Sequence, residues 1–199
     1  MGEAGEDSEV RAQIAASARA ILERNQWRHL KLRTVIREAD VSARRFYGLF
    51  ANEADLAVFL LEQDFETIRT GLVSALEEHP VGWSGIERFV AAYLEIFLNP
   101  GVENQRRYYH AQLEQGSAQL RFTTMRSQVL QPLERALEEA KGLGEISVDD
   151  PVADAHRAYN VLEGIIYSVL WAERDDDPAT LTDSVQSFLR RAFGAKALP

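Results

Sequence analysis

Two adjacent arginines, a tyrosine and a glycine fall within one short stretch of the first quarter of the chain. If this stretch is helical, Phe46 and Phe50 lie on one face, and Arg44, Tyr47 and Gly48 lie on the opposite face. An arginine can make two hydrogen bonds to a guanine edge, a tyrosine hydroxyl can donate to a phosphate, and a glycine lets the backbone approach closely. The second face therefore predicts contact with duplex DNA.

Neighbouring residues extend this predicted surface toward the phosphates. Arg45 lies at the flank of the same helix, where it is better placed for a phosphate than for a base edge. Arg33 and Thr34 begin a preceding short helix, whose first backbone N–H groups also favour a phosphate. The full set of predicted DNA-contacting residues is Arg33, Thr34, Ser42, Ala43, Arg44, Arg45, Tyr47 and Gly48.

The distribution of charge supports the same prediction. Residues 24–50 contain seven basic and two acidic side chains, a local charge of +5 in a chain of net charge −9. Residues 1–23 carry −3 and residues 51–199 carry −11. A polyanionic partner needs cations gathered on one patch and not a cationic chain, so one end of this protein could approach DNA.

Apolar residues recur at helical spacing along nearly the whole chain, which predicts an all-α fold of about nine helices. Ser8 is expected to cap the first helix, and Asp40-Val41-Ser42 separates short helices near 33–39 and 43–49. Ser42 caps the second of these, and Asn52 caps a long helix after it. Later helices are expected near 86–97, 102–115, 117–141, 151–174 and after Pro178. The two short helices and their turn form a helix-turn-helix pattern.

The segment VIREADVSARRFYGLFANEADL resembles the TetR family of bacterial transcriptional regulators. Matching positions are Ile36, Ala39, Val41, Ser42, Phe46, Tyr47, Phe50 and Leu56. Asp40 replaces the usual turn glycine, which is tolerable because aspartate enters left-handed backbone conformations more readily than most residues. Arg37 replaces a small alanine, Leu49 a residue that often contacts phosphate, and Glu53 a phosphate-binding lysine. We hypothesise that Arg44 and Arg45 compensate for the lost cation.

The resemblance implies a DNA-binding domain at 1–52 and a helical ligand-binding and dimerisation domain at 53–199. It also implies a homodimer that pairs the last two long helices, and repression as the mode of action. The apolar set on 152–174 is wider than one core-facing stripe needs, which independently favours a second packed face. Candidate interface residues are Leu162, Ile166, Val169, Leu170, Leu181, Val185, Phe188 and Leu189.

The resemblance further implies a cavity for a small-molecule effector, which we expect to be apolar or aromatic. Most aromatic residues at helical spacing simply belong to a core, but Asn160 and Glu163 interrupt an apolar helix and need buried partners or a ligand. Candidate ligand-binding residues are Tyr93, Phe97, Tyr109, His110, Phe122, Met125, Arg126, His156, Tyr159, Asn160, Glu163 and Tyr167.

Two other classes of protein stay open. One is an all-α enzyme, although the four histidines are scattered, no cysteine is present, and no phosphate-binding loop or nucleophile motif occurs. The other is a helical scaffold that binds protein through its acidic body and keeps a degenerate DNA-binding head. We expect no catalysis, cofactor or metal. The acidic start and the lack of a long apolar run predict a cytoplasmic protein without a membrane partner.

Overall fold

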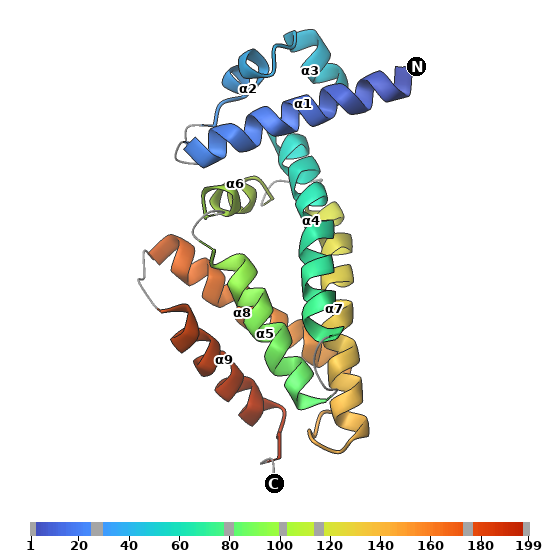
Figure 1. Ribbon diagram of the computed structural model, residues 1–199, viewed down its shortest axis with the longest axis vertical. Helices are drawn as coiled ribbons and strands as arrows, with labels where there is room; N and C mark the ends of the chain where they lie inside the picture. Colours follow the sequence, from blue (N-terminus) through green and yellow to red (C-terminus); the bar gives the residue numbers. More distant parts are fainter. Residues whose placement is uncertain are drawn as a thin grey trace. The chain divides into compact units, whose positions relative to one another are not determined.

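The computed structural model describes residues 3–24, 30–77, 82–99, 103–113, 118–172 and 177–196. Within these ranges the chain forms nine α-helices and no strand, which confirms the predicted all-α class (Figure 1). None of the described helices has the length and apolar character that a membrane crossing requires. The helices are α1 (Glu3–Arg24), α2 (Leu32–Glu38), α3 (Ala43–Leu49), α4 (Glu53–Glu77), α5 (Trp83–Phe97), α6 (Glu103–Leu113), α7 (Ala118–Gly142), α8 (Pro151–Ala172) and α9 (Pro178–Ala192).

The chain divides into two compact units. Unit 1 contains Met1–Phe65 and Pro100–Thr124, and unit 2 contains Glu66–Asn99 and Met125–Pro199. The first part of α4, together with α6, thus belongs to the same compact unit as the helix-turn-helix. The predicted division after residue 52 does not coincide with this one, and as a division of function it stays a prediction.

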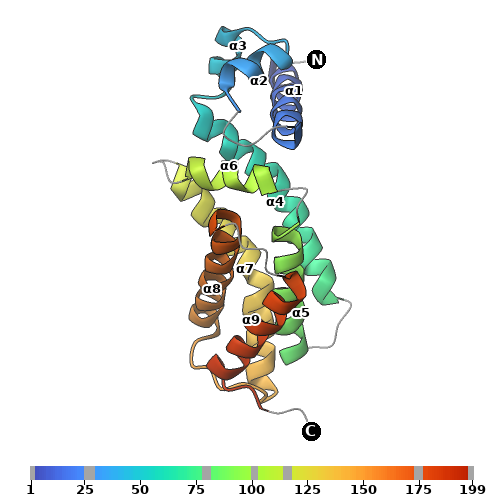
Figure 2. The same ribbon diagram turned by 90° about the vertical axis from the view of Figure 1, so that its left-hand side faces the viewer.

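Unit 1 is built around an aromatic cluster beneath α3. The ring centroids of Phe46 and Phe50 are 5.5 Å apart, and those of Phe50 and Phe59 are 5.3 Å apart. The guanidinium of Arg11, on α1, lies 5.0 Å from the centroid of the Phe50 ring. Because Phe46 and Phe50 are fully buried, α3 is held against α1 and α4 by its apolar face (Figures 1 and 2).

The short helices begin and end close to the predicted positions. The Ser42 hydroxyl accepts a hydrogen bond of 3.1 Å from the Arg45 N–H, and the Asn52 side chain accepts one of 2.9 Å from the Asp55 N–H. Both predicted caps are therefore confirmed. The cap predicted at Ser8 is wrong, because α1 already begins at Glu3 and Ser8 lies inside it.

Unit 2 packs α5 against α8 and α9 (Figures 1 and 2). The buried face of α5 includes Ile86, Phe89 and Tyr93, and polar contacts along its edge fix α9 in place. The Gln186 side chain donates to the Glu87 carbonyl oxygen at 2.8 Å, and Arg190 pairs with the Glu87 carboxylate at 2.7 Å. The C-terminal helix is thereby anchored to the core of its own unit.

Candidate nucleic-acid interface

The two faces of α3 are as different as the sequence predicts. Phe46, Leu49 and Phe50 are buried, whereas Arg44 and Gly48 are exposed and Tyr47 is 57% exposed. A tyrosine with more than half its surface in water gains little from burial, so its position is better explained by what it can contact. The outer face of α3 therefore presents an arginine, a phenol and bare backbone together.

The turn before α3 is held in a conformation that suits few residues. Asp40 has a φ of 50°, the left-handed conformation that its position in place of glycine predicted. The Val41 N–H donates to the Ile36 carbonyl oxygen at 3.2 Å, and the Gln13 side chain donates to the Ala39 carbonyl oxygen at 2.7 Å. These contacts fix the angle at which α3 leaves α2.

The start of α2 adds exposed cations. Arg33 is exposed and Thr34 is half-buried, and the Thr34 N–H donates to the Lys31 carbonyl oxygen at 2.8 Å. That N–H is therefore occupied, so a phosphate contact from Thr34 would fall to its hydroxyl. Lys31 is also exposed and was not among the predicted DNA contacts. It was counted among the seven basic residues of 24–50, but nothing in the sequence singled it out as a contact.

Arg45 is already paired within the protein. Its guanidinium forms an ion pair of 2.6 Å with Asp7, near the start of α1. In the free protein this carboxylate offsets the Arg45 charge, and Arg44 has no ion pair among the described residues. Of the two arginines expected to compensate for Glu53, Arg45 is therefore the one that shares its charge with a carboxylate in the described part of the chain.

Glu53 itself lies in the first turn of α4, where it is half-buried. Burial raises the pKa of its carboxyl, and the nearby positive charge of Lys31 partly opposes this. The Gln112 side chain donates to the carboxylate at 3.4 Å. A carboxylate at the start of α4 disfavours a phosphate there. This agrees with the sequence, in which Glu53 replaces the phosphate-binding lysine of the family pattern.

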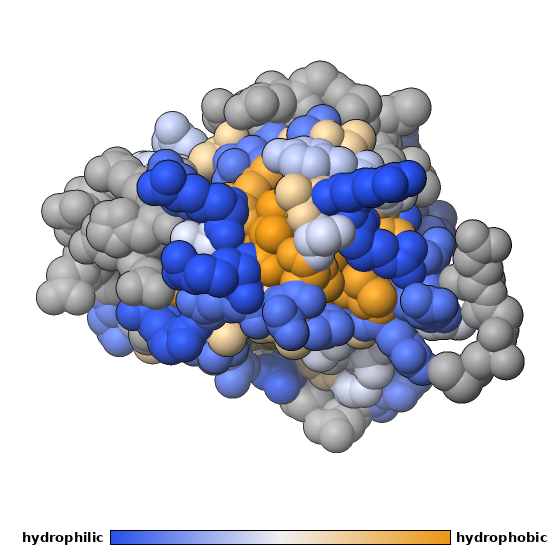
Figure 3. Space-filling model, turned by 90° about the horizontal axis from the view of Figure 1, so that it is seen from above, coloured by the Kyte–Doolittle hydropathy of each residue, from blue (hydrophilic) through white to orange (hydrophobic). Residues whose placement is uncertain are grey.

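The space-filling view in Figure 3 shows the molecule from the side of Figure 1 on which α2 and α3 lie. Apolar residues gather near the middle of this face, and hydrophilic residues surround them (Figure 3).

The structure brings five of the candidate ligand-binding residues together in unit 2. The Tyr93 hydroxyl donates to the Glu163 carboxylate at 2.6 Å, and the Tyr93 and Phe97 rings stack with centroids 4.3 Å apart. Tyr159 meets Tyr93 edge-on at 6.0 Å, and the Arg126 guanidinium lies 5.7 Å from the Tyr159 ring centroid. The partner expected for Glu163 is thus a tyrosine hydroxyl.

The other candidates are placed differently. Asn160 is exposed, so the expectation that it needs a buried partner is wrong, and Tyr167 is 52% exposed. Met125 is buried and His156 is half-buried, but neither has a described polar contact with the cluster around Tyr93. The side chains of His110 and Phe122 lie outside the described part of the structure.

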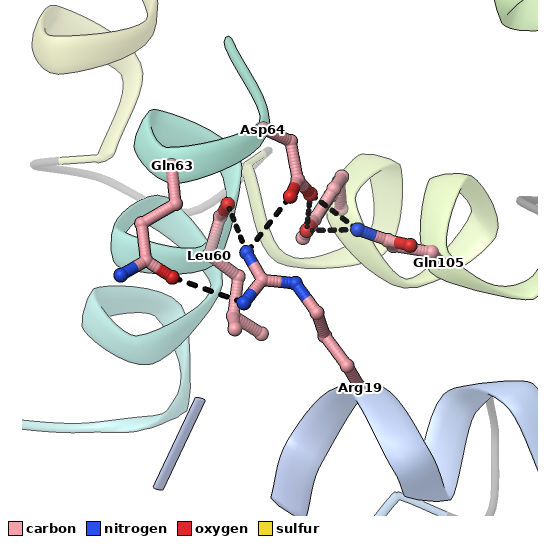
Figure 4. A network of polar contacts seen from close by, with 6 residues as sticks. Arg19, Leu60, Gln63, Asp64 and Gln105 are labelled. Carbon is pink, nitrogen blue, oxygen red and sulfur yellow. Dashed lines mark hydrogen bonds and ion pairs between the residues drawn. The ribbon is translucent and has the colours of Figure 1, made fainter. Parts of the chain in front are cut away.

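Tyr109 belongs to unit 1, where it takes part in a polar network that sequence reasoning missed (Figure 4). Its hydroxyl donates to Asp64 at 2.5 Å, and the Gln105 side chain donates both to that hydroxyl, at 2.7 Å, and to Asp64. Arg19 pairs with Asp64 at 2.8 Å and also bonds to the side chain of Gln63 at 3.0 Å. Burial and the adjacent Asp64 charge raise the pKa of Tyr109.

Most of the candidate interface residues form the core of a single protomer. Five of them are buried within their own chain and have no surface to offer a partner: Leu162, Ile166, Leu170, Val185 and Leu189. Val169 and Leu181 are partly exposed, and Phe188 is 46% exposed. The outer residue Tyr167, which was assigned to the ligand site, is a better interface candidate by its exposure.

Comparison with solved structures identifies the fold. A TetR-family transcriptional regulator from Pectobacterium atrosepticum has 20% identity and a TM-score of 0.76, with 100% of both chains covered. RolR in complex with resorcinol has 17% identity and a TM-score of 0.72, with 98% of this chain and 92% of that chain covered. FadR from Bacillus subtilis in complex with stearoyl-CoA has 15% identity and a TM-score of 0.72, with 89% and 96% covered.

No protein-family model and no curated protein matches the sequence. The likeness to solved structures nevertheless extends over nearly the whole chain, and not only over the helix-turn-helix segment. The chain has the fold of the TetR-family transcriptional regulators, which confirms at the level of fold the resemblance seen in residues 35–56.

Proposed function

We propose that this protein is a TetR-family transcriptional regulator that binds a palindromic operator as a homodimer and is released by a small molecule. The observation that carries the proposal is the outer face of α3, where Arg44, Tyr47 and Gly48 are exposed together over a buried aromatic face. Exposing these three residues does not stabilise unit 1. Their hydrogen-bonding groups and bare backbone suit contacts within a major groove. We further propose that the protein acts as a repressor in the cytoplasm.

In each protomer, different side chains of the helix-turn-helix head, α2 and α3, would contact bases and phosphates. Arg44 would make paired hydrogen bonds to a guanine, and the Tyr47 hydroxyl would donate to a phosphate. Arg33 and Lys31, at the start of α2, would contact the backbone and fix the register. Because one seven-residue helix reaches few bases, two heads on half-sites about one helical turn apart are needed for selectivity.

The test is selection of bound fragments from random duplex DNA, followed by mobility-shift titration of the enriched sequence. We expect a palindrome to be enriched, and we expect its affinity to fall steeply with salt. If no palindrome is enriched and no duplex binds at modest ionic strength, the protein is better explained as a helical scaffold with a degenerate head.

The effector proposed for this regulator is an aromatic or apolar molecule bound at the cluster around Tyr93. The cluster combines stacked rings with two charged groups, Arg126 and Glu163, which could orient a polar substituent. The complexes of RolR with resorcinol and of FadR with stearoyl-CoA support ligand binding by proteins of this fold. The ligand would act by favouring one spacing of the two heads over another.

A thermal-shift screen of phenols, aromatic acids and acyl thioesters tests this part, with hits added to the operator complex. We expect a hit to release the DNA and Glu163→Gln to weaken that hit while leaving operator affinity unchanged. A protein that no compound stabilises, and that stays on its operator throughout, would contradict ligand control.

A further inference from the structure

The one ion pair described for the DNA-reading helix joins Arg45 to Asp7 of α1. The two charged groups are 2.6 Å apart, and their side chains are 37% and 40% exposed, respectively. The Asp7 Oδ1 atom is shielded from water, yet it accepts no aligned hydrogen bond from the described residues. The contact is therefore electrostatic and imperfectly oriented, so a phosphate could replace it at low cost.

Packing fixes Asp7 in this position. Asp7, Arg11 and Ile14 lie on the same face of α1, within about 60° of one another. Ile14 is fully buried, and the Arg11 guanidinium lies over the rings of Phe50 and Phe59 at 5.0 and 5.7 Å. The Asp7 carboxylate is therefore held at the edge of unit 1 that carries α3.

Two acidic neighbours lack this constraint. Glu6 and Glu9 occupy the same stretch of α1 but are exposed, and neither has an ion pair among the described residues. Negative charge near the start of a helix is itself favourable, which accounts for the acidic stretch as a whole. It does not account for the direct contact of one member, Asp7, with a cation of α3.

We propose that Asp7 is an internal competitor for DNA phosphate that attenuates operator binding. This inference rests on the proposed DNA-binding function and concerns how that function is regulated by the chain itself. In the free protein the carboxylate occupies Arg45, and on DNA a phosphate must displace it. The displaced carboxylate then lies within a few ångströms of the phosphates, whose charge has the same sign.

A positioning role for Asp7 is less consistent with the geometry. The backbone of Arg45 is already fixed by its N–H bond to the Ser42 cap, so α3 does not need the carboxylate to hold it. The Asp7 carboxylate brings no donor that DNA could use, and it removes the charge that Arg45 would contribute. The net effect of Asp7 on DNA binding should therefore be unfavourable.

The experiment compares Asp7→Asn with Glu9→Gln in the full-length protein, using salt titrations of binding to the selected operator. Both substitutions remove one negative charge from the same part of α1, but only the first frees Arg45. We expect Asp7→Asn to raise affinity by roughly two- to fivefold per head and to steepen the salt dependence by about 0.9 per head. Glu9→Gln should produce a smaller rise with nearly the same salt dependence.

A double-mutant cycle with Arg45→Ala separates competition from a general charge effect. In the Arg45→Ala background, Asp7→Asn should lose most of its benefit, because the cation it releases is gone. The proposal is overturned if Asp7→Asn lowers affinity, if it matches Glu9→Gln, or if its effect persists without Arg45. Circular dichroism and thermal unfolding confirm that each variant is folded.

The outcome also distinguishes this inference from the function on which it depends. If the wild-type protein binds an operator but Asp7→Asn behaves as Glu9→Gln does, the competitor role fails and the DNA-binding function stands. If neither wild type nor any folded variant binds duplex DNA, the proposed function fails and the competitor role fails with it.

Discussion

At the scale of single residues, two arginines of the helix-turn-helix are equally exposed but differ in their position. Arg44 lies on the outer face of α3, whereas Arg37 lies in the last turn of α2, and both are exposed. Only the first is placed among groups that could enter a major groove. A matched pair of alanine substitutions therefore tests base reading separately from overall charge.

We expect Arg44→Ala to cost about 1–3 kcal/mol per head on the operator, because a lost pair of hydrogen bonds to a base removes that much discrimination. The cost on scrambled DNA should be smaller, so selectivity falls. Arg37→Ala should weaken both DNAs slightly and equally. Competition mobility-shift assays measure, for each variant, the ratio of its affinity for the operator to its affinity for the scrambled duplex. Equal losses for Arg44→Ala on both DNAs would show that Arg44 contacts phosphate only.

Asp40 provides a test of backbone strain at the turn. Its φ of 50° is a conformation that aspartate tolerates and that β-branched residues strongly disfavour. We expect Asp40→Gly to be close to neutral and Asp40→Val to lose about 1–2 kcal/mol of unfolding free energy. Urea unfolding followed by circular dichroism compares the two variants. A valine variant as stable as wild type would mean that the turn can relax to another conformation.

At the scale of helices, the sequence located most elements because their signals are local. Ser42, Asn52 and the apolar spacing of α3 act within one or two turns, and each of these predictions was confirmed. Ser8 misled because a serine shortly before an apolar stripe looks like a helix start even inside a longer helix. Local signals of this kind cannot say how far a helix extends toward the chain end.

Contacts between helices had no such signal. Asp7 pairs with Arg45 and Asp64 with Arg19 across long stretches of sequence, and surface charges of either sign are too common for a pairing to be deduced. Glu163 was noticed because it interrupts an apolar helix, and the same reasoning failed for Asn160, which faces solvent. Helical periodicity identifies apolar faces but does not say whether a polar residue at their edge is covered.

The network around Asp64 predicts a pH dependence of stability in unit 1. The pKa of Tyr109 is raised by burial and by Asp64, and that of Tyr108 by burial and the Glu53 charge. In the unfolded chain a tyrosine ionises near pH 10, while the buried tyrosines keep their protons. Their contribution to stability is therefore complete below about pH 10 and is lost progressively as the pH rises above that value.

We expect the urea midpoint to fall as the pH rises above about 10, and we expect Tyr109→Phe to make that fall shallower. Tyr47→Phe, on the exposed face of α3, is the control and should leave the pH dependence as it is in wild type. At neutral pH, Asp64→Ala should cost about 1–3 kcal/mol, because the Tyr109 hydroxyl and Gln105 lose their acceptor. Identical alkaline profiles for wild type and Tyr109→Phe would contradict the role of this hydroxyl.

At the scale of the whole molecule, the proposed homodimer must use surface that one protomer leaves exposed. Burial removes Leu162, Ile166 and Leu170 from the predicted interface, because those side chains already fill the core of unit 2. Among the described residues, the large apolar side chains that are exposed on α8 and α9 are Val152, at 45%, Tyr167, at 52%, and Phe188, at 46%. Apolar exposure of this size on the last two helices is what a helical interface would cover.

Phe188→Glu should therefore convert a dimer into a monomer, because a charge buried without a partner costs more than a small interface can offset. Leu143→Glu is the matched control, since Leu143 is 58% exposed but follows α7 and lies outside the last two helices. Light scattering after size exclusion measures the mass of each variant. We expect the Phe188 variant also to lose most of its operator affinity. A monomer carries a single helix-turn-helix and cannot bind two half-sites at once. A Phe188→Glu protein that stays dimeric, or a Leu143→Glu protein that becomes monomeric, would place the interface elsewhere.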